Sequence, residues 1–459
     1  MDLITRAMAH FAPRAALRRA EAHTRYTALM NYDGASRGRR TKGWKAPASS
    51  ADAAGYGSRR RLRQLSRDLV RNAPFAARAQ HLITNNVVGG GFVPSINGAE
   101  DPQLRAVLDT HLGTTAIDAM GLNDLAACQR IAMNAVFESG ELLVRRRMRL
   151  KSDGLTLPFQ IELLEPDYLD ETKQWNGGNE VIEGIEFDPW GRVVAYWLYD
   201  QHPGDVSRTI NTKSRRYAAP EILHLRKLDR PGQARGVPWM APVILTLGEM
   251  RDYQEAQITK QRMAALMAFF VESESDAGAS RGTGASALDD IGPGAIIELA
   301  TGQKVTATEP PKVDGYDQFM KQGLSAIASG LGLTYEALSG DLSGVNFSSA
   351  RMGRMEMNRN IEVWQGHIIR AQFLTGIERW MREAWLLNFG KAADWQLSWT
   401  APRPQLVDPT REIPAMVKEI SAGLNSRHGV IRSLGRDPET IDAELQADTF
   451  STAGEIDGE

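Results

Sequence analysis

The segment from residue 349 to residue 389 is built mostly from strong helix formers, and it constrains the fold more than any other part of the chain. Ser348 is placed to cap this helix, with Phe347 and Met352 to staple its first turn. Five of the ten tryptophans lie in the segment or just after it, namely Trp364, Trp380, Trp385, Trp395 and Trp399. Tryptophan at this density packs into a core or an interface more often than it stacks on bases. We therefore expect a long helix that acts as a buried structural spine.

The other segments alternate between helical and strand-like patterns. Helical spacing of apolar residues predicts helices over residues 59–88, 103–137, 238–271, 314–338, 412–422 and 438–447, the first of them divided at Pro74. Runs rich in β-branched and aromatic residues predict strands over residues 141–149, 159–164, 181–187, 192–198, 221–225, 295–299 and 304–308. Most of these strands fall between residues 140 and 230. The expected fold class is α+β, with one compact β-rich module.

Composition excludes several broad classes of protein. The 459 residues are 42% hydrophobic and 24% charged, which suits two to four globular domains and not a disordered or fibrous chain. Cys128 is the only cysteine, so neither an intrachain disulfide nor a thiolate metal cage is expected, and the chain is typical of an intracellular product. The longest apolar run, Met263 to Val271, is far shorter than the roughly 20 residues that span a bilayer. No membrane segment is expected.

Charge divides the chain into a basic start and an acidic body. Residues 1–80 carry 17 basic and 5 acidic side chains, whereas the rest carry 37 and 51. Residues 31–61 are rich in glycine and serine and lack apolar periodicity, which predicts an extended arm. Its basic residues are Arg37, Arg39, Arg40, Lys42, Lys45, Arg59, Arg60 and Arg61, with Trp44 and Tyr56 between them. Such an arm can bind nucleic acid or hold a neighbouring subunit, and the sequence leaves both readings open.

The sequence carries none of the motifs expected of common enzyme classes. It has no phosphate-binding P-loop, no H-E-x-x-H zinc motif and no G-x-S-x-G nucleophile turn. Its eight histidines never fall at the spacing of metal ligands on a helix. We therefore expect no catalytic residues, no metal and no cofactor.

Several fragments nevertheless resemble one known family. Residues 32–35 read YDGA, 67–72 read RDLVRN and 85–91 read NNVVGGG, and further along 164–169 read LEPDYL, 184–188 GIEFD and 191–197 GRVVAYW. Later fragments are RPGQARGVP at 230–238, GLGLTYEAL at 330–338 and NFSSAR at 346–351. In this order and spacing, over roughly residues 30–390, the chain resembles the portal proteins of lambda-type tailed bacteriophages.

The resemblance implies a function without catalysis. Portal proteins of this kind form a ring, a dodecamer in the virion, at one capsid vertex. The terminase motor packages double-stranded DNA through the ring without sequence specificity, and the DNA is later ejected the same way. The implied partners are the terminase large subunit, the major capsid and scaffold proteins, and the head-tail connector. Assembly would take place in the cytoplasm of the host bacterium, for a virus, a prophage or a gene transfer particle. The alternative is another head-tail connector or a basic-armed DNA-binding structural protein, although connectors tend to be much smaller chains.

The family architecture also implies a division of the chain into parts. Residues 1–58 would be the basic arm and 59–237 a wing of helices and the β-rich module. Two stem helices would occupy residues 238–271 and 313–338, with a small α/β clip at 272–312 between them. A tunnel loop at 339–348 would lead into the long helix at 349–389, and a helical crown would fill residues 390–459.

The expected tunnel loop has the composition of a surface that lets DNA slide. Its residues are Ser339, Gly340, Asp341, Leu342, Ser343, Gly344, Val345, Asn346 and Phe347. It contains no lysine or arginine, and each such residue would add a salt-dependent contact with phosphate. The two glycines permit backbone conformations closed to other residues. We therefore expect this loop to line the DNA channel.

Overall fold

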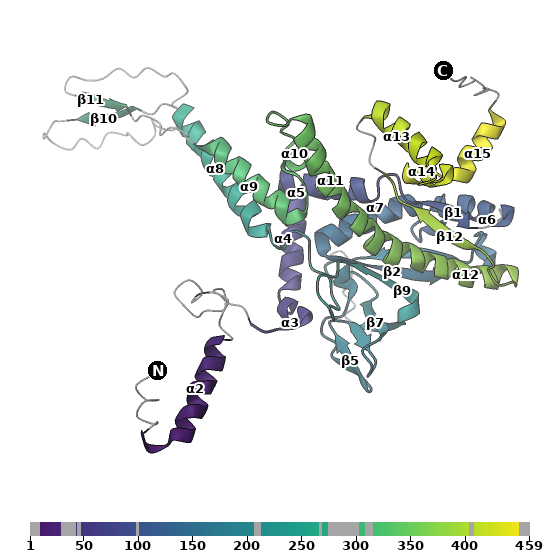
Figure 1. Cartoon of the computed structure of the whole chain (residues 1–459), viewed down its shortest axis with the longest axis horizontal. Helices are drawn as coiled ribbons and strands as arrows, with labels where there is room; N and C mark the ends of the chain where they lie inside the picture. Colours follow the sequence, from purple (N-terminus) through teal and green to yellow (C-terminus); the bar gives the residue numbers. More distant parts are fainter. Residues whose placement is uncertain are drawn as a thin grey trace. The chain divides into compact units, whose positions relative to one another are not determined.

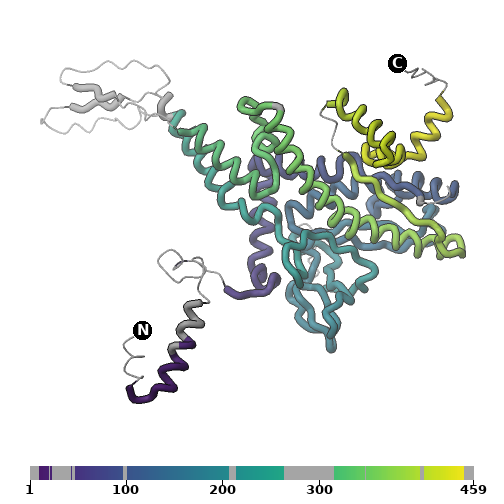
Figure 2. The backbone as a smooth tube through the Cα atoms, viewed as in Figure 1, coloured from purple at the N-terminus to yellow at the C-terminus, as the bar shows by residue number. Residues whose placement is uncertain are grey.

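The computed structural model describes residues 10–28, 43, 47–97, 101–205, 213–265, 269–273, 303–307, 315–403 and 408–448. Figure 2 traces the backbone, coloured from purple at the N-terminus to yellow at the C-terminus. The chain divides into two units, Met1–Ala54 and Gly55–Glu459. In the first unit the described structure includes helix α2, Pro13–Ala28, and α3, Ala51–Gly55, lies at the boundary. Helices and strands together make the second unit an α+β fold, as expected. Within the described ranges, none of the helices has the run of apolar residues that spanning a bilayer requires.

Two consecutive helices, α4 (Arg59–Asn72) and α5 (Pro74–Val87), open the second unit. The expected break at Pro74 is confirmed, because α4 ends at Asn72 and α5 begins at Pro74. Proline is tolerated at this position because the backbone N–H groups of a helix's first turn have no partner within the helix. The stretch expected as one helix over 103–137 is divided instead. It holds α6 (Pro102–Val107), a π-helical turn (Leu108–Leu112), a 3-10 turn (Thr115–Ile117) and α7 (Leu125–Ser139). Residues of α4, α5 and α7 contribute to one shared core.

The β-rich module contains two antiparallel sheets. The first has the order β3-β2-β9 and contains β2 (Glu141–Met148), β3 (Phe159–Leu164) and β9 (Ile222–Arg226). The second is a meander of β4 (Trp175–Asn176), β5 (Asn179–Ile182), β6 (Ile185–Phe187), β7 (Val193–Tyr199) and β8 (Ser214–Ala218). Short 3-10 turns lie at Lys151–Asp153, Pro166–Tyr168 and Ala219–Glu221. A second, smaller core that includes Leu143, Ile185 and Leu198 holds the two sheets together.

The expected strand over residues 181–187 is a hairpin. Glu183 and Gly184 form its two-residue turn, and both have left-handed backbone angles, with φ of +45° and +88°. Two such residues make the turn type that matches the twist of a hairpin, but glutamate is an unusual choice for the first of them. The side chain of Glu183 accounts for this choice, as described below.

Helices α8 (Ile244–Ala265) and α9 (Tyr316–Leu331) lie side by side and correspond to the two expected stem helices (Figure 1). Two glycines of α9, Gly323 and Gly330, allow this helix to approach α8 and the residue before it closely. A Cβ atom on Gly330 would lie 2.6 Å from Cγ1 of Val243, and one on Gly323 would lie 2.6 Å from Sδ of Met250. Both helices are shorter than expected. Helix α8 begins at Ile244 and not at residue 238, and residues 269–271 belong to a strand. The helix expected over 314–338 is divided, because Gly332 ends α9 with a φ of +71° and a separate short helix, α10 (Tyr335–Ser339), follows.

The strands between the stem helices differ from the expected pair. Strand β10, Phe269–Ser273, pairs antiparallel with β11, Gln303–Ala307. The expected strand at 304–308 is thus confirmed to within a residue. Its expected partner at 295–299 lies outside the described residues, and β11 pairs with the segment that follows α8 instead.

A nearly continuous helical rod follows the stem. It starts after the short helix α10 (Tyr335–Ser339) and consists of α11 (Phe347–Trp364), a π-helical segment (Gln365–Leu374) and α12 (Thr375–Phe389). The expected long helix at 349–389 is confirmed. Its inner face is buried in the main core, and so are Trp380, Trp385, Trp395 and Trp399. Trp364 packs on Trp239, with 4.8 Å between ring centroids, so the expectation of a tryptophan-rich spine is confirmed.

The C-terminal part returns to the body before forming three helices. Strand β12 (Gln396–Thr400) pairs with β1 (Val93–Asn97), about three hundred positions earlier, a pairing that the sequence did not indicate. The helices are α13 (Pro409–Ser421), α14 (Arg427–Ser433) and α15 (Pro438–Ala447). The helices expected at 412–422 and 438–447 are confirmed, and α14 was missed. Asp437 accepts a hydrogen bond from Ser95 Oγ at 3.1 Å, which fixes α15 to β1.

Candidate channel loop and supporting charge network

The expected channel loop, residues 339–348, is shorter than predicted, because Ser339 ends α10 and Phe347 begins α11. The loop between these helices, residues 340–346, is shaped by its own hydrogen bonds. Gly340 ends α10 with a φ of +77°, the left-handed conformation that glycine adopts freely, whereas Gly344 is not among the residues with positive φ. Asp341 accepts hydrogen bonds from the backbone N–H of Ser343 at 3.0 Å and its hydroxyl at 2.6 Å. These bonds, aided by Tyr335, lower the pKa of the Asp341 carboxyl, which keeps the loop anionic.

The loop presents one large apolar side chain to solvent. Leu342 is 70% exposed, and Val345 is half-buried. Asn346 closes the loop, because its side-chain oxygen accepts a hydrogen bond from the backbone N–H of Ser349 at 2.9 Å. Asn346 is therefore the N-cap of α11, and the expected cap at Ser348 is wrong. Phe347 is the first residue of α11, and its side chain lies outside the described residues.

A cation from another helix lies beside the loop. Arg78 of α5 donates from Nε to the carbonyl oxygen of Ala337 at 2.8 Å. Its guanidinium is also the group that a Cβ atom on Gly340 would meet, at 3.5 Å. Arg78 thus anchors the base of a loop that has no basic residue of its own.

The residues expected to form the basic arm separate into three groups. Arg37, Arg39, Arg40, Lys42 and Lys45 lie outside the described residues. Arg60 and Arg61 are exposed on the first turn of α4, where they remain available to a partner. Arg59 is buried and forms an ion pair with Glu183 of the same chain, so its expected place in an exposed basic patch is wrong.

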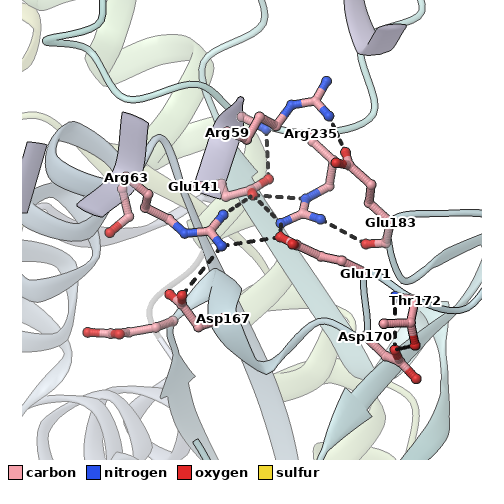
Figure 3. Close-up of polar contacts among 12 residues, drawn as sticks. Arg59, Arg63, Glu141, Asp167, Asp170, Glu171, Thr172, Glu183 and Arg235 are labelled. Atoms are coloured by element: carbon pink, nitrogen blue, oxygen red, sulfur yellow. Dashed lines mark hydrogen bonds and ion pairs between the residues drawn. The ribbon is translucent and has the colours of Figure 1, made fainter. Parts of the chain in front are cut away.

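Arg59 belongs to a buried charge network that sequence reasoning missed. Figure 3 shows arginines of α4 meeting carboxylates from β2, the loop after β3 and the Glu183 turn. At its centre, Glu141 accepts from Arg235 Nε at 2.9 Å, from the Gly236 N–H at 2.7 Å and contacts His224 Nε2 at 2.9 Å. Burial alone would raise the pKa of the Glu141 carboxyl, but Arg235 and His224 together hold it well below its usual value.

Further contacts extend this network along α4. Arg63 lies 3.2 Å from Glu171 and 3.4 Å from Asp167, and Arg67 lies 2.6 Å from Asp167. Several members fall in the fragments that carried the family resemblance: Asp167 in LEPDYL and Arg235 in RPGQARGVP. The RPGQARGVP fragment also contains Gly236, at a position with no room for a side chain. A Cβ atom on Gly236 would lie 2.2 Å from the carbonyl oxygen of Gly140, so the two backbones pass too closely for any side chain.

One cluster near the network has the composition of a metal site. Ligand atoms of Glu165, Asp167 and His202 lie within 4.8 Å of one another. Arg67 already occupies the position between the carboxylates, at 3.0 Å from Glu165 and 2.6 Å from Asp167. A guanidinium there neutralises the charge that would attract a cation. We interpret the cluster as the outer end of the ion-pair network.

Comparisons with known proteins agree with the sequence resemblance. The family model for "Phage portal protein, lambda family" matches residues 37–365. A probable portal protein of Halomonas phage phiHAP-1 is 26% identical over 433 residues, which are 88% of this chain and 83% of that protein. Portal protein B of Escherichia phage lambda is 22% identical over 480 residues, with 91% and 88% covered.

Among solved structures, a chain from the virion of a native gene transfer agent particle matches with a TM-score of 0.48 and 14% identity, covering 84% of this chain and 98% of that one. The crystal structure of an HK97 family portal protein from Corynebacterium diphtheriae matches with a TM-score of 0.39 and 12% identity, covering 76% and 98%. The family match extends over most of the chain, from the arm to the end of α11. The chain belongs to the lambda family of phage portal proteins.

Proposed function

We propose that this chain forms the ring at one capsid vertex through which a terminase packages double-stranded DNA, and through which the DNA later leaves. Family membership over residues 37–365 is the observation that carries the proposal. In the same proposal the chain is part of the virion and attaches head-tail connector proteins on the outside, and the ring assembles in the host bacterial cytoplasm. The chain acts as a conduit and not as an enzyme.

The loop at residues 339–347 is the proposed contact with moving DNA. An exposed leucine at its tip and an anionic Asp341 allow contact with the duplex without ion pairs to phosphate. Each phosphate neutralised by a lysine or arginine adds binding free energy that weakens with salt, and such binding opposes sliding. The hydrogen bonds of Asp341 and Asn346 give this loop a defined shape at the end of a long helix. A loop with a defined conformation and no basic residue would contact DNA without binding its phosphates, which suits passage of DNA of any sequence.

The basic arm, residues 1–58, is proposed to contact a neighbouring subunit, with DNA as its alternative partner. The charge distribution supports the first partner, because residues 1–80 are strongly basic and the rest of each chain is acidic. Removal of residues 1–58 should lower the yield of rings more than it lowers affinity for DNA. Rings that persist unchanged while DNA binding disappears would favour the second partner.

The first experiment measures particle mass and shape. Purified full-length protein should form closed rings with a central hole in negative-stain images, and mass photometry should give one dominant multiple of 50.6 kDa. Monomers or dimers alone, across a range of salt and protein concentrations, would contradict the portal function. The same preparations should show no ATP hydrolysis above that of a buffer control.

The second experiment tests the loop in a packaging assay with the cognate terminase and capsids. Leu342→Arg should leave ring formation intact and slow packaging, most at low salt, because it adds one phosphate contact per subunit. Leu342→Ser, which adds no charge, is the matched control and should package at close to the normal rate. Deletion of Asp341 to Val345 retains the Asn346 cap and should impair transport or retention of DNA in assembled rings. Normal packaging by both Leu342→Arg and the deletion would exclude the loop from this role.

A further inference from the structure

The side of α12 that faces solvent forms one wall of a groove. Four residues of this wall recur at spacings of four, three and four, which places them along one face of the helix: Thr375, Arg379, Arg382 and Leu386. The segment that follows the helix supplies the other wall with Ala392 and Ala393, and the groove has a volume of about 550 Å³. Arg382 donates to the carbonyl oxygens of Trp395 at 2.6 Å and Ala393 at 3.0 Å. The second wall is therefore fixed to the helix, and the groove is preformed.

Two cations in this groove have no carboxylate of their own. Among the residues that the structure describes, neither Arg379 nor Arg382 forms an ion pair. Their hydrogen bonds go to backbone carbonyl oxygens, and for Arg379 this is the oxygen of Pro220 at 3.3 Å. A carbonyl oxygen accepts a hydrogen bond but leaves the charge of the guanidinium uncompensated, so an anion would bind both groups more strongly.

Two glutamates also line the groove, and they do not remove this excess of positive charge. Glu383 forms an ion pair with Arg146 of β2. Glu378 accepts a hydrogen bond from a backbone N–H of β12 at 3.3 Å. The guanidinium groups of Arg146, Arg379 and Arg382 thus outnumber the two carboxylates.

An apolar side chain lies between the two uncompensated arginines. At 3.6 residues per turn, Leu386 is about 20° from Arg379 and about 40° from Arg382, on opposite sides around the helix axis. Leu386 is 51% exposed, and the two alanines of the second wall add further apolar surface to the groove. The arrangement fits a ligand with an apolar side chain and a carboxylate on either side of it, because arginine binds carboxylates with two parallel hydrogen bonds.

One segment of this chain has that composition. Residues 448–459 read DTFSTAGEIDGE, with four carboxylate side chains and no basic residue. Within this segment, Glu455, Ile456 and Asp457 place one branched apolar side chain between two acids. The described residues extend to Asp448, the residue that follows α15.

The fold brings the start of α15 close to the groove. Asp437, the residue before α15, accepts a hydrogen bond from Ser95 of β1, and β1 pairs with β12. The first residue of β12, Gln396, itself lines the groove. Helix α15 has ten residues and is about 15 Å long, whereas the chain from Asp448 to Ile456 spans up to about 26 Å. The segment is therefore long enough to return past α15 toward the groove.

We propose that residues 455–457 bind in the groove on α12 of the same chain, with the isoleucine on Leu386 and the two carboxylates paired with Arg379 and Arg382. The contact ties the segment after α15 to α12 and closes the groove to other acidic partners. It does not depend on ring formation, so it can be tested apart from the proposed function.

A fluorescent peptide of residues 448–459 tests the contact by anisotropy. A chain that lacks residues 449–459 should bind the peptide saturably. The full-length chain should bind it more weakly by about tenfold or more, because its own segment is present at high effective concentration. Absence of binding to the truncated chain, or equal binding by the truncated and full-length chains, would overturn the inference.

Substitutions in the truncated chain locate the peptide. Arg379→Glu should weaken peptide binding by about tenfold or more, because it replaces an attractive charge in the groove with a repulsive one. Arg359→Glu, at an exposed position of α11 outside the groove, is the matched control and should bind the peptide normally. Equal effects of the two substitutions would show that the peptide responds to overall charge and does not occupy the groove.

Disulfide trapping in the full-length chain identifies which copy supplies the segment. Cys128, the native cysteine, is fully buried and does not compete. Leu386→Cys combined with Ile456→Cys should give an intrachain disulfide on mild oxidation, seen as faster migration on a denaturing gel without reductant. Met355→Cys with Ile456→Cys, at an exposed position of α11, is the control and should remain unlinked.

Two outcomes of the trapping experiment would overturn the inference while leaving the proposed ring intact. Interchain disulfides alone would assign the groove to the segment of a second copy. No disulfide at all with the cysteine at position 386 would show that the segment binds elsewhere.

Discussion

Arg59 and Glu183 form a buried ion pair that joins the first turn of α4 to the hairpin turn between β5 and β6, 124 positions later in the sequence. The pair explains why glutamate occupies a left-handed turn position that asparagine or glycine would adopt more easily. Burial of two charges is costly, and the pair is retained because each charge compensates the other.

Glu183→Gln should destabilise the protein strongly, because it leaves the Arg59 guanidinium buried without its counter-charge. We expect a loss of about 3 to 5 kcal/mol in the free energy of unfolding, measured by urea denaturation. Arg192→Gln breaks the exposed pair with Asp188 and is the matched control, expected to cost less than about 1 kcal/mol. Equal effects of the two substitutions would show that burial of the Arg59 pair is irrelevant to stability.

Gly330→Ala should destabilise the stem, because its new methyl group would overlap a methyl of Val243. Overpacking of this kind costs about 1 to 3 kcal/mol, from which the better helix propensity of alanine recovers up to about 1 kcal/mol. Gly248→Ala is the control on the facing helix, since its Cβ atom would meet nothing within 4 Å. That variant should be as stable as the unchanged protein or more so. Thermal unfolding of both variants at equal ring content checks the prediction.

Asn346→Ala should remove the cap of α11 and destabilise the start of the long helix by about 1 kcal/mol. Ser348→Ala, at the position that sequence reasoning favoured, should have little effect. Hydrogen exchange of the backbone amides of residues 347–351 would locate the change. Faster exchange in Ser348→Ala than in Asn346→Ala would reverse the assignment of the cap.

Acid should destabilise the protein through His111, which is fully buried against Phe159 with ring centroids 5.1 Å apart. Burial lowers the pKa of His111 to about 4, so between about pH 4 and pH 6.5 the unfolded chain binds a proton that the folded chain does not. The stability from neutral His111 is complete above pH 6.5 and declines as pH falls toward 4, by up to about 3 kcal/mol.

The substitution His111→Phe keeps an aromatic ring in this position and removes its titration. We expect the decline in stability between pH 6.5 and pH 4 to become shallower in this variant, measured by urea denaturation at several pH values. A residual slope is expected from His224, whose pKa burial also lowers to about 4. An unchanged slope in His111→Phe would show that other groups account for acid sensitivity.

Local sequence patterns predicted much of this fold because the forces behind them are local. Apolar spacing located α4, α5, α9 and α12 since each buries one face, and Pro74 marked the break between the first two. The cap of α11 was ambiguous because Asn346 and Ser348 can both accept an N-terminal N–H. The two residue types cap equally well, and Asn346 is the cap because the loop places its side-chain oxygen next to the backbone N–H of Ser349.

Long-range contacts left no such local pattern. The pairing of β1 with β12 and of β10 with β11 depends on which segments the fold brings together, and neither strand of such a pair identifies the other. The charge network was missed for the same reason, since Arg59, Arg63 and Arg235 resemble solvated residues until their partners are known. Of the three consecutive arginines that begin α4, Arg59 is buried whereas Arg60 and Arg61 are exposed, and composition could not predict this difference.

The helical rod from Phe347 to Phe389 is about 65 Å long at 1.5 Å per residue, and it joins the loop after α10 to the tryptophan-rich core. Its one departure from α-helical bonding is the π-helical segment that begins at Gln365, and there the helix should bend most easily. The Gln365 side chain bonds the carbonyl oxygens of Val87 at 3.1 Å and Pro402 at 3.0 Å. The point at which this long helix bends most easily is therefore also the point at which one side chain ties it to the end of α5 and to the segment after β12.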